Sequence, residues 1–150
     1  MPQSQEIYPY RERVLPGLLF YAATLVFPGA LFLISLPFGE ELAYLVVLGS
    51  IVSILGLSWL SSPVIFIDQK TLHLGKAVIP RELLSKATVI SSNESFAAKG
   101  RNLDMKAFVR FQPAVKGLVK VELSDPDDPT PYWLFSTRNP EIIVDRLNRR

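Results

Sequence analysis

An almost uncharged apolar stretch is the strongest constraint on this chain. Between residues 14 and 67 the only charged side chains are Glu40 and Glu41. Residues 14–36 and 42–62 contain no Asp, Glu, Lys, Arg or His, and at ~1.5 Å rise per residue a helix of either run crosses a ~30 Å hydrocarbon core. Neither run has a polar stripe at helical spacing, so each helix needs apolar surroundings on all sides. A soluble chain of 150 residues could hardly bury both, and we predict two membrane spans.

The charges that flank this stretch predict its orientation. Arg11 and Arg13 precede the first span, Lys70 and Lys76 follow the second, and the turn between the spans has no Lys or Arg. The positive-inside rule therefore places both termini in the cytoplasm of a plasma membrane protein. A secretory signal peptide is the alternative, but the apolar run is too long and lacks a small-x-small cleavage pattern at its end.

Three features of the spans and their flanks lead to further expectations. Pro28, followed by glycine, removes a backbone donor and predicts a kink in the first helix. Tyr8 and Tyr10 are expected to lie at headgroup level as interfacial anchors. Small residues in the second span allow close approach of another helix, either the first span or a second copy in a homodimer; they are Gly49, Ser53 and Gly56.

The remainder of the chain has the composition of a small soluble domain. We divide the chain into a cytoplasmic segment (1–13), the transmembrane hairpin (14–63) and a cytoplasmic domain (64–150). That domain carries 14 Lys and Arg against 10 Asp and Glu, a formal charge of +4. This charge is too weak to indicate nucleic acid but suits a domain beside anionic lipid. The chain has no cysteine, which excludes disulfides, thiolate nucleophiles and cysteine metal sites.

Hydrophobic periodicity predicts an α+β fold for the cytoplasmic domain. The C-terminal helix is expected to begin at Pro140 with Asn139 as its cap, and to pack Ile143 and Leu147 on the sheet. Six or seven short antiparallel strands closed by this helix outline a pleckstrin-homology-like small β-barrel. The polar residues 91–106 are expected to form a long mobile loop with at most one helical turn. The expected strands are residues 64–68, 71–74, 77–79, 87–90, 107–112, 118–123 and 132–136.

Parts of the sequence carry a family resemblance. They are residues 10–13 (Tyr-Arg-Glu-Arg), the acidic proline run 125–133 and the following residues 136–140. With the two spans and the pattern of residues 110–120, they resemble the actinobacterial family called domain of unknown function 3093. The likeness covers nearly the whole chain. It implies architecture, namely a helical hairpin before a pleckstrin-homology-like domain, and it carries no catalytic residues because the family has no assigned activity.

No pattern in the chain indicates catalysis or a cofactor. His73 is the only histidine, and on an alternating strand it is expected to be structural; no second histidine exists for a common metal site. Asp125, Asp127 and Asp128 could bind a divalent cation, although the alternating prolines are better explained by a stiff turn. The chain also lacks a glycine-flanked nucleophilic serine and a phosphate-binding glycine loop. A metal-dependent membrane hydrolase or transferase using these aspartates is the remaining enzymatic hypothesis.

The basic side chains of the cytoplasmic domain are the candidate contact residues. We expect a non-enzymatic binding or scaffolding module that holds a protein partner at the inner membrane face, through a sheet edge and the groove beside the terminal helix. The alternative is recognition of anionic lipid headgroups by basic loops. Arg138, between an aromatic strand and a helix cap, is expected to fix that corner or bind a ligand. The candidate residues are Lys99, Arg101, Lys116, Lys120 and Arg138.

Overall fold

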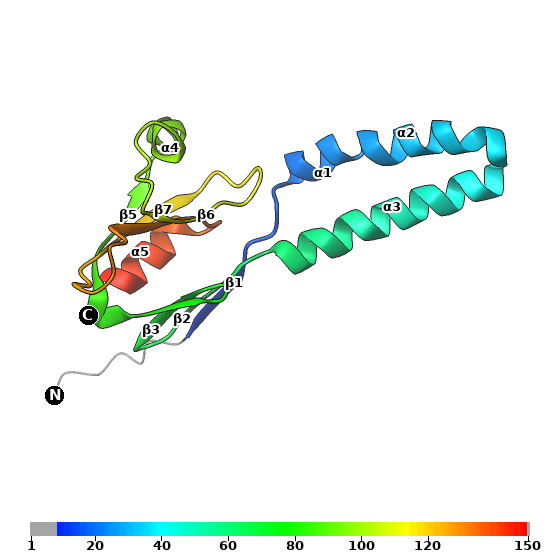
Figure 1. Ribbon diagram of the computed structural model, residues 1–150. Helices are drawn as coiled ribbons and strands as arrows, with labels where there is room; N and C mark the ends of the chain where they lie inside the picture. Colours follow the sequence, from blue (N-terminus) through cyan, green and yellow to red (C-terminus); the bar gives the residue numbers. More distant parts are fainter. Residues whose placement is uncertain (1–8, 150) are drawn as a thin grey trace. The chain divides into compact units, whose positions relative to one another are not determined.

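The computed structural model describes residues 9–149, which form two compact units (Figure 1). Residues 15–62 make a helical unit. Residues 9–14 and 63–149 together make a unit of two β-sheets and two helices. Residues 1–8, which include the predicted anchor Tyr8, and Arg150 lie outside the described part of the chain.

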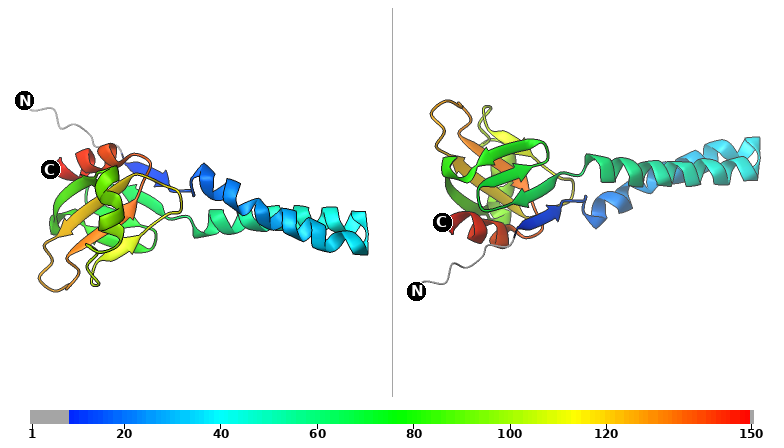
Figure 2. Two further views of the ribbon diagram at one scale, coloured as in Figure 1. Left: turned by 90° about the horizontal axis from the view of Figure 1, so that it is seen from above. Right: turned by 90° about the horizontal axis from the view of Figure 1, so that it is seen from below.

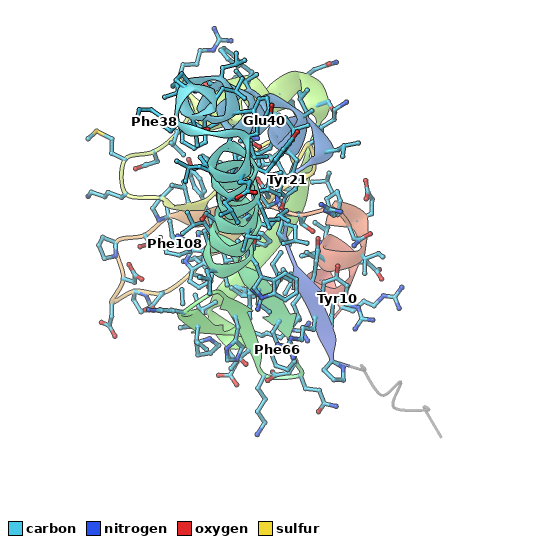
Figure 3. All side chains as sticks on the ribbon, turned by 90° about the vertical axis from the view of Figure 1, so that its right-hand side faces the viewer. Tyr10, Tyr21, Phe38, Glu40, Phe66 and Phe108 are labelled. Carbon is cyan, nitrogen blue, oxygen red and sulfur yellow. The ribbon has the colours of Figure 1, made fainter. Side chains whose placement is uncertain are left out.

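The helical unit is a hairpin of apolar helices, α1 (Leu18–Thr24), α2 (Val26–Ser35) and α3 (Glu40–Ser61). A short 3-10 turn (Leu36–Phe38) and a glycine join α2 to α3, so that Phe38 and Glu40 lie together at the end of the hairpin (Figure 3). The segments Leu18–Phe38 and Glu40–Ser61, of 21 and 22 residues, are long and apolar enough to cross a membrane.

The predicted kink in the first span is observed one turn before its proline. Pro28 has no backbone N–H, so the carbonyl of Thr24, four residues earlier, loses its helical partner. The helix is accordingly interrupted at Leu25, and α2 resumes when the N–H of Gly29 donates to the Leu25 carbonyl (3.3 Å).

The small residues of α3 do not face the first span, contrary to one of the two predictions. A Cβ atom added to Gly49 or Gly56 would meet no atom within 4 Å, and Ser53 is exposed. The buried residues of α3 are instead Ala43 and Ser58, because the short turn fixes which face of α3 returns along α2. A homodimer through the exposed small residues stays a prediction.

The β unit consists of two separate four-stranded sheets rather than one closed barrel. Sheet A is antiparallel, in the order β1-β2-β3-β4, and its strands are β1 (Tyr10–Arg13), β2 (Val64–Ile67), β3 (Thr71–Leu74) and β4 (Ala77–Pro80). Sheet B has the order β5-β7-β8-β6, with β5 (Leu84–Ile90), β6 (Phe108–Arg110), β7 (Leu118–Leu123) and β8 (Tyr132–Ser136).

The predicted barrel fails because the chain leaves sheet A before it starts sheet B. A 3-10 turn (Arg81–Leu83) separates β4 from β5, and in the described residues no ladder joins the two strands. The expectation of purely antiparallel pairing is also wrong, since β6 runs parallel to β8. The α+β class is confirmed.

A single apolar core lies between the sheets and is covered by α5 (Pro140–Asn148). Alternation along the strands places every second side chain inward, as the sequence predicted for β7. Helix α5 contributes Ile143 and Leu147. The second helix, α4 (Ser92–Lys99), lies on the opposite face of sheet B from α5 (Figure 1). Buried core side chains from the sheets include Ile65, Ile67, Leu72, Leu74, Ile79, Leu84, Val119, Val121, Trp133 and Phe135.

The residues just before the first span form a strand of this core unit, which the sequence analysis missed. Arg13 of β1 pairs with Val64 of β2, and the Val14 N–H donates to the Pro63 carbonyl (3.0 Å). Val14 is completely buried. Residues 15–62 are therefore inserted between two neighbouring antiparallel strands, in the place of a hairpin turn.

Glu12 joins this strand to the start of α5. Its carboxylate accepts hydrogen bonds from the Tyr10 hydroxyl (2.8 Å), the Thr137 hydroxyl (2.7 Å) and the Arg138 backbone N–H (2.8 Å). Tyr10 lies between β1 and α5 (Figure 3), and its hydroxyl accepts from the side-chain amide of Asn139 (3.2 Å). Asn139 precedes α5 as predicted, but its side chain makes no capping hydrogen bond. Tyr10 belongs to this folded corner and is not a free interfacial ring.

Gln112 provides a second connection between the sheets. Its side-chain amide donates to the Val14 carbonyl (2.7 Å), and its backbone N–H donates to the Ser136 hydroxyl (3.1 Å). Both bonds are buried, so their loss would leave polar groups unsatisfied. Figure 2 shows the two sheets and α5 of the β unit from two further directions.

This arrangement predicts that residues 9–14 are needed for the β unit to fold. A chain in which Asn-Gly replaces residues 15–62 should be soluble and unfold cooperatively, because this dipeptide forms a tight antiparallel turn. Residues 63–150 alone lack Val14 and the Glu12 carboxylate, and should lose at least about 3 kcal/mol of stability. Thermal unfolding followed by circular dichroism compares the two.

The variant Glu12→Gln in the joined chain is the control, since it keeps β1 and alters only the carboxylate. It should unfold between the other two. Equal unfolding temperatures for the joined chain and for residues 63–150 would contradict this role of β1.

A second prediction concerns alkaline pH. Burial, together with its hydrogen bond to Glu12, raises the pKa of Tyr10 from 10.0 to about 12. Between these values the folded state holds a proton that the unfolded state has lost, so the stability should fall as the pH rises from 10 to 12. Tyr10→Phe should be less stable at pH 8 but show a shallower decline, measured by urea unfolding at each pH.

Asn139→Ala is the matched control, because it removes a hydrogen bond of the corner but keeps the phenol. It should retain the decline above pH 10. If Tyr10→Phe declines as steeply as the unchanged protein, Tyr10 does not cause the alkaline loss of stability.

Candidate functional site

Helix α4 is the main departure from the predicted loop over residues 91–106. The Ser91 hydroxyl caps the helix, accepting from the Glu94 N–H (3.4 Å) and donating to the Glu94 carboxylate (2.8 Å). The Ser-x-x-Glu spacing is that of a capping box, although the Glu94 carboxylate here accepts from the Ser91 hydroxyl and not from its backbone N–H. This spacing is the sequence signal that could have predicted the helix. The chain then folds back, with the Asn102 N–H donating to the Ala97 carbonyl (2.9 Å).

A groove of about 440 Å³ lies between α4 and the outer face of sheet B. Its floor consists of sheet residues from β5, β7 and β8, namely Ile90, Lys120, Tyr132 and Leu134. Its wall consists of residues from α4 and the segment that follows, namely Asn93, Glu94, Ala97, Ala98, Arg101 and Asn102. The site therefore combines an apolar floor with two basic side chains and two amides.

The two basic groups enter the groove from different elements. Lys120 rises from the centre of β7, with its Nζ 3.1 Å from a Glu122 carboxylate oxygen and 4.6 Å from the centroid of the Tyr132 ring. Arg101 is exposed and follows α4. The pair with Glu122 is partly solvated and contributes little to stability, so Lys120 stays available to an incoming anion.

Tyr132 fastens the rim of the groove. Its hydroxyl accepts a hydrogen bond from the backbone N–H of Asp104 (2.8 Å). The ring meanwhile lies under Lys120. The segment after α4 is thus bonded to β8. This bond could not be predicted from the sequence, because Asp104 and Tyr132 are far apart in the chain.

The outer side of α4 and its following segment exposes two large apolar side chains. Phe96 is 90% exposed and Met105 is fully exposed. Lys99, Arg101 and Lys106 lie within the same stretch of the chain, and we call these five sequence neighbours the α4 patch. An exposed aromatic ring and an exposed thioether amid basic residues are typical of a contact surface.

The five predicted contact residues do not form one surface. Arg101 and Lys120 meet in the groove, and Lys99 lies on α4 with its Nζ 5.5 Å from the centroid of the Phe111 ring. Lys116 and Arg138 lie elsewhere, beside the contact in which the Thr137 N–H donates to the Gly117 carbonyl (3.0 Å).

The Gly117 contact is possible only for glycine, because a Cβ there would collide with the Thr137 carbonyl oxygen. The described carboxylate that holds the Arg138 corner is Glu12, through the Arg138 backbone N–H. The sequence had suggested that the Arg138 side chain pairs with the acidic turn, whereas this corner is held by the contact of its backbone N–H with Glu12. A ligand-binding role for Arg138 stays a prediction.

The acidic turn is organised by its own backbone. Asp125 accepts from the Asp127 N–H (3.0 Å), and Asp128 accepts from the Thr130 N–H (2.8 Å). Hydrogen bonds from the Thr130 side chain and backbone lower the pKa of Asp128. Among residues 9–149, no three His, Asp or Glu side chains come together in an arrangement that could hold a metal ion.

His73 has structural partners on sheet A. Its ring contacts the Thr71 hydroxyl (2.9 Å) and packs edge-on against Phe66.

Helix α5 bonds to the edge of β5. The side-chain amide of Asn148 bonds to both the N–H and the carbonyl of Ala87 (3.0 Å each). The edge of β5 is therefore occupied at this point by α5 itself, while the predicted contact of a protein partner through a sheet edge, which specified no strand, stays a prediction.

Comparison with known protein families agrees with the resemblance found in the sequence. The family described as "Protein of unknown function (DUF3093)" matches residues 9–147. That range contains the Glu12 corner, both apolar helices and the groove. No curated protein and no solved structure matches the chain. Because the match covers nearly the whole sequence, the chain belongs to this family of proteins of unknown function.

Proposed function

We propose that the protein is a membrane-anchored, non-enzymatic binding module whose β unit docks on anionic lipid at the inner face of the plasma membrane. Both termini lie in the cytoplasm in this proposal. The observation that carries it is the α4 patch, where Phe96 and Met105 are exposed among three basic side chains.

The composition of the patch favours lipid as its occupant. Apolar side chains gain by leaving water at the headgroup boundary, and each Lys or Arg near an anionic surface contributes ~1 kcal/mol. Neither the burial of two apolar side chains nor the attraction of three basic side chains gives strong binding alone. Two apolar helices joined to the β unit would supply the rest, because a tether raises the effective concentration of the surface to the millimolar range.

A protein partner on the same patch is the second candidate function. Large exposed aromatic and thioether side chains also fill pockets of partner proteins, and Phe96 is such a side chain. This candidate uses a different surface from the predicted contact through a sheet edge and the groove beside α5, where Asn148 bonds to Ala87 of β5.

The pleckstrin-homology-like relation is also part of this proposal. It is supported by the sequence of short strands followed by a terminal helix, and by the packing of Ile143 and Leu147 of that helix in the core.

A dye placed on α4 tests docking directly, since the chain has no cysteine of its own. Ser92→Cys in the first turn of α4 is labelled with an environment-sensitive fluorophore, and the full-length protein is placed in lipid nanodiscs containing a lipid-borne quencher. Quenching should be strong in anionic discs at low salt, and weak in zwitterionic discs or at high salt. The triple change of Lys99, Arg101 and Lys106 to Gln should reduce docking about 100-fold, at ~1 kcal/mol per charge.

Changing Lys70, Lys86 and Arg110 to Gln is the matched control, because it removes the same charge from exposed positions outside the patch. The control should dock like the unchanged protein. The double change of Phe96 and Met105 to Gln should weaken docking in all salts. Quenching that does not depend on lipid charge or on the basic residues would refute lipid docking and favour a protein partner.

A further inference from the structure

We infer that the groove beneath α4 binds a small organic anion, a phosphate or carboxylate carried on an apolar body. This site shares only Arg101 with the α4 patch, because the groove lies on the inner side of α4 whereas Phe96 is exposed on the outside. The inference therefore does not rest on the proposed docking.

The size and floor of the groove fit the apolar part of such a ligand. Its volume of about 440 Å³ lies within the usual ~300–1,000 Å³ of small-ligand sites. Leu134 and Ile90 form an apolar base, and Leu134 is only 1% exposed. The facing residues of α4 are the small Ala97 and Ala98, which leave this space between helix and sheet open.

The charges of the groove select an anion. Arg101 and Lys120 bring two positive charges to it, and a guanidinium can bind phosphate or carboxylate through two parallel hydrogen bonds. Glu94 is the acidic residue of the lining, and its carboxylate already accepts the Ser91 hydroxyl in the helix cap. The two basic residues of the lining outnumber its one carboxylate, and the bond of Lys120 to Glu122 is partly solvated, so an anion is favoured over a cation.

The remaining polar groups suit orientation of the ligand. The amides of Asn93 and Asn102 line the same groove and offer donors beside the two cations. Tyr132 contributes its ring, while its hydroxyl remains engaged by the Asp104 N–H. The rim is therefore held in place before a ligand binds, which lowers the entropic cost of binding.

The test uses full-length protein in zwitterionic nanodiscs with n-hexyl phosphate as the probe, followed by saturation-transfer NMR. Hexyl phosphate should bind saturably, whereas hexanol, which lacks the anion, and inorganic phosphate, which lacks the apolar body, should bind at least tenfold more weakly. Arg101→Gln and Lys120→Gln should each reduce the affinity about tenfold or more. Arg110→Gln is the matched control, since Arg110 is exposed on β6 outside the groove.

Two further variants keep the result decisive. Ala98→Leu should fill the groove and reduce binding without a change in net charge, with circular dichroism confirming the fold. The Phe96 and Met105 double change should leave groove binding intact even where it abolishes docking on lipid. Equal binding of hexanol and hexyl phosphate, or equal affinity of the Arg101 and Arg110 variants, would overturn the inference.

A competition arm identifies the source of the anion. Dihexanoyl phosphatidic acid, a short-chain soluble lipid, is added to the complex with hexyl phosphate. If the phosphatidic acid displaces half of the bound hexyl phosphate at a concentration that corresponds to tighter binding than that of hexyl phosphate, a lipid headgroup is supported as the ligand. Weaker displacement would support a water-soluble organic phosphate.

Discussion

The pairing of β1 with β2 is the constraint on which the β unit depends. The two strands flank the apolar hairpin in sequence, yet they are neighbours in sheet A. Val14, the last residue before the hairpin unit, is completely buried in the core. Glu12 then extends the dependence to the far end of the chain, because its carboxylate accepts from Thr137 and from the Arg138 backbone before α5 begins. Residues 10–13 and 136–140, two of the stretches that carry the family resemblance, thus meet in one hydrogen-bonded corner.

How well each helix or strand could be predicted depends on how far apart in the chain its interacting residues lie. The apolar hairpin and strands β2, β3, β7 and β8 carry their own periodic signal. The structure places the four strands within about a residue of the prediction and the ends of the two apolar segments within about four residues. Strand β1 has four polar or aromatic residues and no alternation, so only its distant partner identifies it. Helix α4 has a weak apolar signal, and its capping-box spacing was the available clue. The short helical turn after β4 was expected from Pro80, but the split into two sheets depends on which strands pair on either side of that turn, and pairing has no local signature.

For the same reason, the sequence could not predict which side chains come together at the candidate site. Basic residues can be counted in a sequence, but the side chains that lie beside each of them depend on the fold. Lys120 has Glu122 and the Tyr132 ring beside it, Lys99 lies near the Phe111 ring, and the surroundings of Lys116 and Arg138 are set by the contact at Gly117. Of the five residues, only Arg101 and Lys120 converge, and they do so because β7 forms the centre of the floor while α4 crosses above it.

The position of Arg101 links the two proposed activities. It lines the groove and also belongs to the α4 patch, so a single guanidinium would be shared by a bound anion and the lipid surface. An anion in the groove cancels part of the charge that draws α4 to anionic lipid, at a cost of up to ~1 kcal/mol. Thermodynamic reciprocity then requires that docking weaken the affinity of the groove by the same factor, about fivefold. If both sites bind as proposed, the ligand and the membrane therefore compete through one side chain, and the groove would act as a sensor that releases α4 from the bilayer.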